Sequence, residues 1–257
     1  MIRGRNINII ASRRGTIVRH REIWKFGGTS VDDTEKRHAV GEKIAQANDM
    51  DVVVVVSAAA GVTDSLHREI GSLAEVPQHL IDSYVATGEM MSAPLVAAAI
   101  HAAGRPTAVV PATQLFSCDN RFGDATVQAV QTAPILRLLR QRVVPVVGGF
   151  FGLSGDGRLI TLGRGGSDYS AVLLAAALGC DVCLFKASCD GVYDADPNCV
   201  AVARRYESLT HDQACDLAAK GAKVLQAKAS DLARAKKVTI RVRPAFAEGF
   251  GTVIKAS

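Results

Sequence analysis

The sequence predicts an α/β fold in which a mainly parallel sheet is covered by helices. Strand-like apolar runs alternate with helical patterns over almost all of the 257 residues. The run DVVVVVS at 51–57 is typical of a strand with both faces buried, as in a parallel sheet. The composition agrees, because 48% of the residues are apolar but only 5% are aromatic. We therefore expect one doubly wound unit that binds its ligands at the carboxyl ends of its strands.

The individual elements follow from hydrophobic periodicity and from the turn residues between them. In the first half of the chain we expect strands at 22–26, 51–57, 107–111 and 143–150 and helices at 33–47, 78–103 and 124–141. In the second half we expect a hairpin around the Gly-Asp-Gly turn at 155–157, strands at 182–186 and 238–243, and helices at 167–178, 211–220 and 227–236. Each half has a glycine-rich loop at the end of a strand, which suggests two ligands that meet across the sheet.

The positive charge of the chain is concentrated at its N-terminus. Residues 1–21 contain six arginines and no acidic residue, whereas the whole chain has a formal charge of +5. The remainder therefore has a formal charge of −1 and lacks the basic footprint of a nucleic-acid-binding protein. We interpret 1–21 as a disordered basic extension or an over-extended start, in preference to a transit peptide. No apolar run reaches the roughly 18 residues of a membrane span, so we expect neither nucleic acid nor a membrane as a partner.

Six cysteines without a secretory signal indicate reduced thiols in a cytoplasmic protein. Cys180 and Cys183 have the spacing of half a zinc knuckle. No second pair of cysteines or histidines stands at ligand spacing, and Cys183 belongs to the apolar run VCLF. We therefore expect buried thiols and no metal-ligating residues.

The stretch KFGGTS, which begins at Lys25, directly follows the first strand. Gly27 and Gly28 permit a tight turn and a close approach of the backbone to a ligand. Lys25 stands at the strand end, where its ammonium group can reach a phosphate. Thr29 and Ser30 are placed to cap the next helix, whose N-terminus would then face the site. A structural turn would also explain the glycines, and the spacing fits neither a Walker A loop nor a dinucleotide fingerprint.

A second glycine-rich loop has the sequence TLGRGGSDYSA and spans 161–171. Arg164 interrupts its glycines and Asp168 follows them, although a simple phosphate cradle needs no carboxylate. The glycines of this loop therefore let a ligand approach the backbone closely, and its side chains provide one cation and one anion. We expect it to lie between the two ligands.

Several motifs of this chain resemble, in order, those of the aspartokinases of the amino acid kinase family. They are KFGGTSV, SAAAGVTD, TGEMMSA, FSCDNRFGDA, GGFFGLSGDGRLITLGRGGSDYSA and KGAKVLQAKA, and the similarity spans about 22–255. The resemblance implies a three-layer αβα amino acid kinase fold with a mainly parallel central sheet. It implies a catalytic domain at 22–257 whose N-terminal half binds the acceptor and whose C-terminal half binds ATP. The implied reaction transfers the γ-phosphoryl group of ATP, with Mg²⁺, to the side-chain carboxylate of L-aspartate or a close analogue.

The resemblance implies three catalytic residues. Lys25 and Lys223 match two lysines near the phosphates, and Asp168 matches the acid that orients them. Positioning and charge stabilisation dominate phosphoryl transfer, so cations matter more than a strong base. A carboxylate acceptor is already ionised at neutral pH, so we assign Asp168 an organising role and not that of a general base.

The resemblance also implies how the acceptor is recognised. An amino acid zwitterion needs an anion for its ammonium group and a cation for its α-carboxylate, and Glu89 and Arg164 match these roles. Without the motif context, Glu89 would be interpreted as a solvated carboxylate at a helix start and Arg164 as a cation of a surface loop. The implied acceptor-binding residues are Thr29, Ser30, Ser57, Glu89, Phe122, Gly123, Arg164, Gly165 and Ser167. The implied nucleotide-binding residues are Gly27, Gly28, Lys186, Ala187, Ser188, Asp190, Gly191, Tyr193, Asp196, Pro197, Gly221, Lys223 and Val224.

The nucleotide segment FKASCDGVYDADP departs from the aspartokinase pattern. Ala187 and Ser188 replace the usual Thr-Asp pair, and the run resembles the uridylate kinases of the same superfamily. Lys186 would then add a cation near the donor phosphates. Cys118 stands where Thr is usual, and VLQAKA replaces VLHPRA. Two alternatives therefore stay open: a kinase with another acceptor, such as a modified amino acid or UMP, and a non-catalytic nucleotide-binding protein on the same fold.

Most aspartokinases continue into paired ACT domains that bind lysine or threonine. No counterpart follows GTVI in this sequence, so we expect a catalytic domain that these amino acids do not inhibit. The superfamily also implies a homodimer or a higher homo-oligomer.

Overall fold

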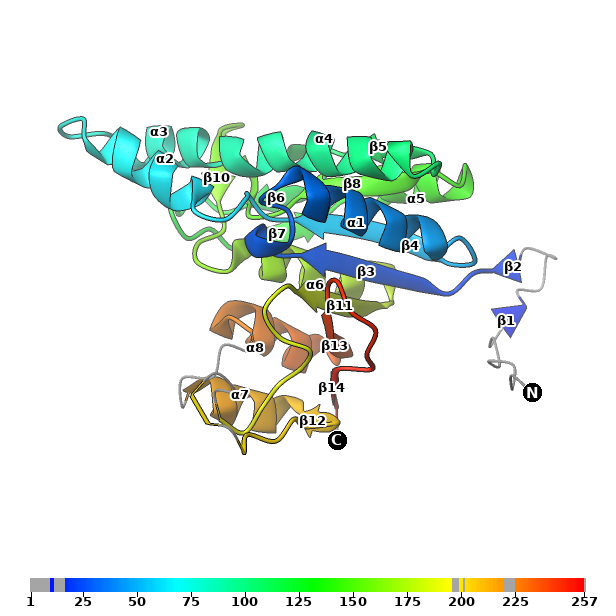
Figure 1. Cartoon of the computed structure of the whole chain (residues 1–257). Coiled ribbons are helices and arrows are strands. Elements are labelled where there is room, and N and C mark those ends of the chain that lie inside the picture. The colour runs from blue at the N-terminus through cyan, green and yellow to red at the C-terminus, as the bar shows by residue number, and fades with distance from the viewer. Residues whose placement is uncertain (1–9, 12–16, 196–198, 201, 220–224, 257) are drawn as a thin grey trace, which may run out of the picture.

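The computed structural model describes residues 10–11, 17–195, 199–200, 202–219 and 225–256. Its main feature is an eight-stranded sheet (Figure 1) with the strand order β12-β14-β13-β11-β3-β4-β8-β5. Neighbouring strands are parallel except for β13 and β14. The predicted fold class, with its mainly parallel sheet, is confirmed. The strands are β3 (Arg21–Phe26), β4 (Asp51–Val56), β5 (Thr107–Val109), β8 (Val144–Gly148), β11 (Asp181–Lys186), β12 (Ser208–Thr210), β13 (Ile240–Pro244) and β14 (Thr252–Lys255).

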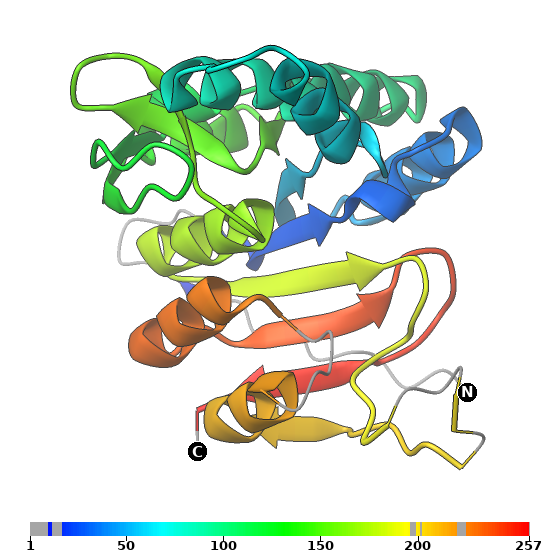
Figure 2. The ribbon, with the colours of Figure 1, turned by 90° about the vertical axis from the view of Figure 1, so that its left-hand side faces the viewer.

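Helices cover both faces of this sheet and produce the three-layer arrangement. They are α1 (Thr34–Gln46), α4 (Thr87–Ala102), α5 (Ala133–Arg140), α6 (Gly166–Leu178), α7 (His211–Ala219) and α8 (Ala227–Lys236). One buried cluster packs α1 and α4 on one face, and another packs α5, α6, α7 and α8 on the other face. Figure 2 shows α6, α8 and α7 stacked one above another on their side of the sheet.

The valine run in β4 shows why both faces need a cover. Val52, Val54 and Val56 join the cluster under α1 and α4, whereas Val53 and Val55 join the cluster under α6. Successive side chains of a strand point to opposite faces, so an unbroken apolar run buries itself only between two helical layers.

A second, four-stranded sheet has the order β10-β9-β6-β7. Its strands are β6 (Phe116–Cys118), β7 (Val127–Val130), β9 (Phe151–Ser154) and β10 (Leu159–Thr161), and β9 and β10 form the predicted hairpin. The helices α2 (Val62–Gly71) and α3 (Gln78–Val85) project beyond one end of the central sheet (Figure 1). The short antiparallel strands β1 (Ile10–Ala11) and β2 (Ile17–Val18), within the predicted extension, lie beyond the other end.

Two of the predicted helices are wrong in part. In the predicted helix 124–141, Val127–Val130 instead forms β7 against β6, and the helix begins only at Ala133. Pro134 lies in its first turn, where the missing N–H would have had no helical partner. The predicted helix 78–103 is divided into α3 and α4, which meet at Ala86.

The predicted cap of the first helix is also wrong. Thr29 and Ser30 belong to a one-turn 3-10 helix at Gly28–Ser30 and do not cap α1. Asp33 caps α1 instead, because its side chain accepts the backbone N–H of Lys36 at 2.8 Å.

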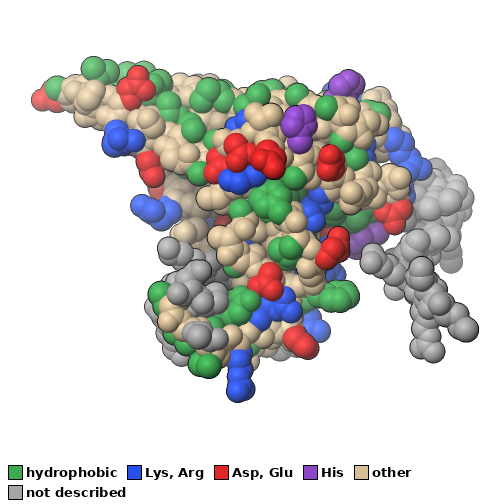
Figure 3. Space-filling model, in the orientation of Figure 1, with side chains coloured by type: hydrophobic (Ala, Val, Ile, Leu, Met, Phe, Trp, Pro, Cys, Tyr) green, Lys and Arg blue, Asp and Glu red, His purple; other side chains and the backbone are tan. Residues whose placement is uncertain are grey.

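The surface charge of the molecule is mixed, and its cysteines are free. Acidic and basic side chains are interspersed on the face shown in Figure 3. In the part of the chain that the structure describes, no helix is long and apolar enough to cross a bilayer, and no three acidic, His or Cys side chains gather as metal ligands. All six cysteines are free, and burial raises the pKa of Cys180 and of Cys183 to about 12. These two thiols therefore stay protonated at neutral pH.

Helices α1 and α4 approach each other closely at Gly41. A Cβ atom on Gly41 would lie 2.5 Å from the carbonyl oxygen of Ala99. The contact fixes the position of α1 on the sheet, and α1 in turn follows the KFGGTS loop.

We predict that Gly41→Ala lowers the free energy of unfolding by about 1–3 kcal/mol, because the two backbones must separate. This loss outweighs the gain of up to about 1 kcal/mol that Ala brings to a helix. Urea denaturation measures the change. Gly71→Ala is the matched control, since nothing lies within 4 Å of its added Cβ at the end of α2. An equal loss in both variants would contradict the packing argument.

Candidate active site

The candidate active site lies at the carboxyl ends of β3, β4, β8 and β11. Lys25 is the penultimate residue of β3, and Lys186 is the last residue of β11. Ser57 follows β4, and its N–H donates to Phe26 at 3.2 Å. Gly149 follows β8 and donates to the carbonyl that ends β4 at 2.9 Å. The parallel strand order thus brings residues of both halves to one edge of the sheet.

Lys25 and Asp168 form a buried ion pair between β3 and α6. Their exposed fractions are only 7% and 6%. Asp168 lies in the first turn of α6, where the helix dipole favours a negative charge. Burial acts to raise the pKa of Asp168, but the ammonium groups of Lys25 and Lys186 hold that pKa below its ordinary value. The carboxylate is therefore ionised at neutral pH and paired with a lysine.

Lys186 adds a second cation beside this pair. Burial lowers the pKa of Lys186, the carboxylate of Asp168 opposes that shift, and the charge of Lys25 adds to it. With all three groups ionised, two ammonium groups face one carboxylate. The excess positive charge is of the kind that a phosphate chain would neutralise.

Glu89 presents an unsatisfied carboxylate close to the same strand ends. It lies in the first turn of α4 and is 3% exposed. Its Oε1 accepts the N–H of Ala58, which follows β4, at 3.0 Å, whereas Oε2 has no hydrogen-bond partner among the described residues. Burial raises the pKa of Glu89 to about 7, although backbone N–H groups and the charge of Lys25 oppose the shift. Glu89 is therefore not a solvated carboxylate of a helix start.

Arg164 lies exposed in the loop between β10 and α6. Among the described residues no ion pair or hydrogen bond engages its guanidinium group, which leaves its donors available to a ligand. Gly165 beside it has a φ of 73°, which favours glycine, and Gln226 occupies the space that a Cβ would need. The loop is thus packed against the segment that precedes α8.

Asp82, which no sequence motif singled out, joins two loops on the predicted acceptor side. It is 1% exposed, and its Oδ2 accepts the N–H of Gly123 at 2.8 Å and that of Thr161 at 2.9 Å. Its Oδ1 accepts from the side chain of Gln78 at 2.9 Å. Asp82 thereby ties the predicted acceptor wall to the strand that leads into the loop of Arg164. The sequence signal was an acidic residue within the apolar helical run LIDSYV.

Lys228 makes a second connection, from the C-terminal half. Its ammonium group donates to Asp124 at 2.8 Å, to the carbonyl of Ala125 at 2.7 Å and to that of Leu162 at 3.1 Å. It also lies 5.0 Å from the ring centre of Tyr169. Lys228 stands where VLHPRA carries its arginine, so this departure from the aspartokinase pattern keeps the positive charge.

The remaining predicted residues of the first two loops differ in exposure. Ser30 and Ser167 are buried, Ser57 is half-buried and Thr29 is exposed. The Oγ of Ser30 has no hydrogen-bond partner among the described residues. The KFGGTS turn packs on the loop after β4, since a Cβ on Gly28 would lie 2.6 Å from a carbonyl oxygen of that loop.

The predicted nucleotide segment is held by an internal hydrogen bond and by contacts with Arg205. Asp190 accepts the hydroxyl of Tyr193 at 2.6 Å and the guanidinium of Arg205 at 2.7 Å, and these groups lower the pKa of Asp190. Gly191 packs against Arg205, because a Cβ would lie 2.6 Å from its Cδ. Asp190 and Tyr193 therefore have a structural role in this segment, in addition to any contact that they make with a ligand. The remaining predicted residues Asp196, Pro197, Gly221, Lys223 and Val224 lie outside the described residues.

Comparison with known proteins identifies the family. The model of the amino acid kinase family matches residues 21–244, so the chain belongs to this family. It is 37% identical over 241 residues to an aspartokinase of Thermus thermophilus, and the aligned region covers 91% of this chain and 58% of that relative. It is 39% identical over 237 residues to an aspartokinase of Pseudomonas aeruginosa, covering 90% and 57%. The chain thus spans little more than half the length of these relatives.

Solved structures agree with this assignment. The aspartate kinase from Synechocystis superposes with a TM-score of 0.82 at 31% identity, covering 92% of this chain and 40% of the other. The E. coli aspartokinase III in complex with aspartate and ADP gives a TM-score of 0.82 at 25% identity, covering 93% and 65%. A UMP kinase from Bacillus anthracis shares the fold, with a TM-score of 0.67 at 16% identity over 92% and 96% of the two chains. The predicted three-layer amino acid kinase fold is confirmed.

We predict that Asp82→Asn lowers the free energy of unfolding by about 1–3 kcal/mol, because an amide has no negative charge and keeps only one of the two acceptor oxygens that Gly123, Thr161 and Gln78 share. Chemical denaturation measures the loss. Asp64→Asn is the control, since Asp64 is exposed in α2 and the substitution removes the same charge. If Asp82→Asn and Asp64→Asn had the same free energy of unfolding, the structural role of Asp82 would be refuted.

Proposed function

We propose that the chain catalyses the ATP-dependent phosphorylation of the side-chain carboxylate of L-aspartate. The observation that carries the proposal is the buried pair of Lys25 and Asp168, with Lys186 beside it and the unsatisfied carboxylate of Glu89 at the same strand ends. The similarity to aspartokinases over about nine-tenths of this chain supports the choice of acceptor.

The chemistry needs positive charge and positioning more than it needs a base. An oxygen of the acceptor carboxylate forms a bond to the γ-phosphorus of ATP, and the bond from that phosphorus to the bridging oxygen of ADP breaks. The products are an acyl phosphate and ADP, and no proton is removed because the carboxylate is already ionised. Lys25 and Lys186 would stabilise the charge on the transferring group, and Asp168 would hold Lys25 in place.

The acceptor would be held at both of its charged ends. Glu89 offers a buried, unsatisfied Oε2 to an ammonium group, and the exposed Arg164 offers a planar guanidinium to the α-carboxylate. A nucleotide acceptor such as UMP has no ammonium group for Glu89, and a buried carboxylate would repel its phosphate. This argues for an amino acid and against UMP.

Mg²⁺ would enter with ATP, since it usually binds through phosphate oxygens and few protein carboxylates. The cluster of Lys25, Lys186 and Asp168 has two ammonium groups for one carboxylate, which fits a nucleotide that brings its own cation, and we assign no protein ligand to the ion. When bound, the ion neutralises charge on the β- and γ-phosphates.

We further propose that the protein works in the cytoplasm and as a homo-oligomer. Six free thiols suit a reducing compartment. The outer side of α4 leaves Met90, Met91 and Leu95 exposed by 38–52%, which supports contact with another copy.

Hydroxylamine trapping tests the reaction directly, because an acyl phosphate reacts with hydroxylamine to give a hydroxamate. With ATP and Mg²⁺ we expect hydroxamate from L-aspartate and none from UMP. Coupled ADP release, measured in parallel, reports turnover with any acceptor. ADP release with another acceptor, and no hydroxamate from aspartate, would overturn the substrate assignment.

The pH dependence of aspartate binding tests the role of Glu89. The pKa of Glu89 in the folded protein is about 7, so the neutral form of its side chain becomes the major form below that pH. The KM for aspartate should therefore fall as the pH rises towards 7, by up to about tenfold per unit, and level off above it. Glu89→Gln should raise this KM and remove its pH dependence, while the KM for ATP stays nearly constant. A wild-type KM for aspartate that is flat between pH 6 and 8 would exclude this role, taking those limits as about one unit either side of the pKa.

A further inference from the structure

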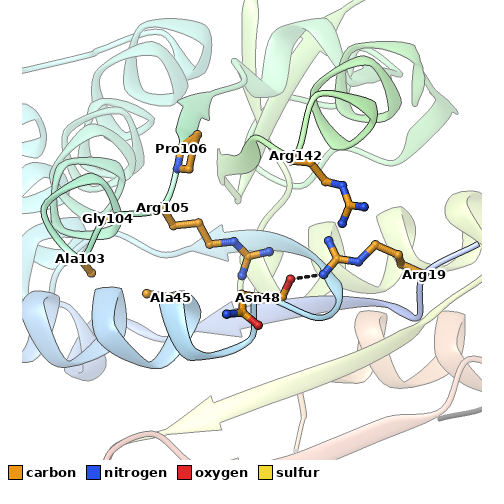
Figure 4. A pocket seen from close by; sticks show the side chains of 8 residues that line it. All are labelled: Arg19, Ala45, Asn48, Ala103, Gly104, Arg105, Pro106 and Arg142. Carbon is orange, nitrogen blue, oxygen red and sulfur yellow. Dashed lines mark hydrogen bonds between the residues drawn. The ribbon is translucent and has the colours of Figure 1, made fainter. Parts of the chain in front are cut away.

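A cavity of about 350 Å³ lies at the end of the sheet opposite to the candidate active site. Arg105 and Arg142 precede β5 and β8, and Arg19 precedes β3, so the cavity lies at the amino ends of these strands. Figure 4 shows the three guanidinium groups turned towards the same space. The lining consists of Arg19, Ala45, Asn48, Ala103, Gly104, Arg105, Pro106 and Arg142.

Arg105 is held rigidly against the end of α1. It donates to the carbonyl oxygens of Ile44 at 2.6 Å, Ala47 at 2.8 Å and Met50 at 3.0 Å. These bonds satisfy the free carbonyls at the helix end but carry no net negative charge. The positive charge of Arg105 therefore remains beside the cavity.

Arg19 is fixed in a similar way. Its guanidinium donates to the carbonyl oxygens of Asn48 and Asp49 and lies 3.6 Å from the carboxylate of Asp51. Asp51 also pairs with Arg21 at 3.6 Å, so one carboxylate serves two arginines. Burial lowers the pKa of Arg105, and the positive charge of Arg19 adds to that shift. The two fixed guanidinium groups thus repel each other, and the carboxylates of Asp49 and Asp51 offset only part of the charge that Arg19, Arg21 and Arg105 bring together.

Arg142 has no comparable structural task. It is exposed, and among the described residues no ion pair or hydrogen bond engages its side chain. Its φ of 62° lies in the left-handed region, which glycine adopts without strain. The chain therefore keeps a strained arginine at the mouth of a cavity that already contains two fixed cations.

We propose that this cavity binds a small oxyanion ligand that carries phosphate or carboxylate groups. Arg142 supplies planar pairs of N–H donors that match these groups, while Arg105 and Arg19, most of whose N–H groups are engaged by backbone carbonyls, add fixed positive charge. The volume lies at the lower end of the range for small-molecule sites, which suits a metabolite larger than a single phosphate ion. The site is separate from the proposed catalytic centre, and the inference does not depend on the reaction proposed above.

Calorimetric titration of the full chain with inorganic pyrophosphate and with succinate tests the proposal. The wild type is compared with Arg142→Gln and with the control Arg140→Gln, which removes the same charge from the exposed end of α5 outside the cavity lining. We expect Arg142→Gln to weaken at least one probe by about tenfold, and the control to bind like the wild type. The stronger probe tells a phosphate ligand from a dicarboxylate. Pyrophosphate binding at the active site is common to all three proteins and cancels in the comparison.

Arg142→Gly separates binding from folding. Glycine relieves the left-handed backbone, so the thermal midpoint should be no lower than that of the wild type, while binding weakens as in Arg142→Gln. Equal affinities of the wild type and both Arg142 variants for both probes would overturn the proposal. A loss in Arg140→Gln as large as in Arg142→Gln would also overturn it, since general charge would then explain the binding.

Discussion

The buried ion pair between Lys25 and Asp168 joins the first strand of the sheet to the helix that begins the C-terminal half. Both charges have left water, so each depends on the other for its ionised form. A buried pair of this kind adds little net stability compared with apolar residues, but removing one partner typically costs about 3–5 kcal/mol. Its value therefore lies in placing a cation at a fixed point on the sheet edge. The glycine-rich loops on either side take their positions from the strand and the helix that the pair connects.

The proposed acceptor side is organised by polar side chains that satisfy backbone groups across loops. Asp82 accepts N–H groups from two segments that are distant in the chain, and Lys228 reaches over from the C-terminal half to donate to acceptors in the same two segments. Such contacts cost little once they are satisfied, but a half-satisfied network would be expensive in a buried setting. This explains why Glu89 stands out. It lies in the same buried region, yet Oε2 has no hydrogen-bond partner among the described residues.

The two ends of the sheet have different chemistry for a structural reason. At the carboxyl ends, helix N-termini and strand-end side chains gather cations and carboxylates around the candidate active site. At the amino ends, the chain leaves α1 with free carbonyl oxygens, and Arg105 and the backbone after the helix meet there. Arginines fit this end because they satisfy carbonyls and keep their charge. The arginine-lined cavity follows from that arrangement.

The sequence by itself determined the αβα class, most strands and helices, and the position of Lys25, Asp168 and Lys186 at strand or helix ends. Periodicity and glycine-rich loops are local signals, and a parallel sheet places strand ends together whatever the details. The tertiary structure decided what local signals do not encode. The register of β6 and β7 turned the first part of a predicted helix into a strand, and Asp33 replaced Thr29 and Ser30 as the cap of α1. The roles of Asp82, Lys228 and the three arginines of the cavity depend on partners up to about a hundred residues away in the chain, so only the folded chain brings them together.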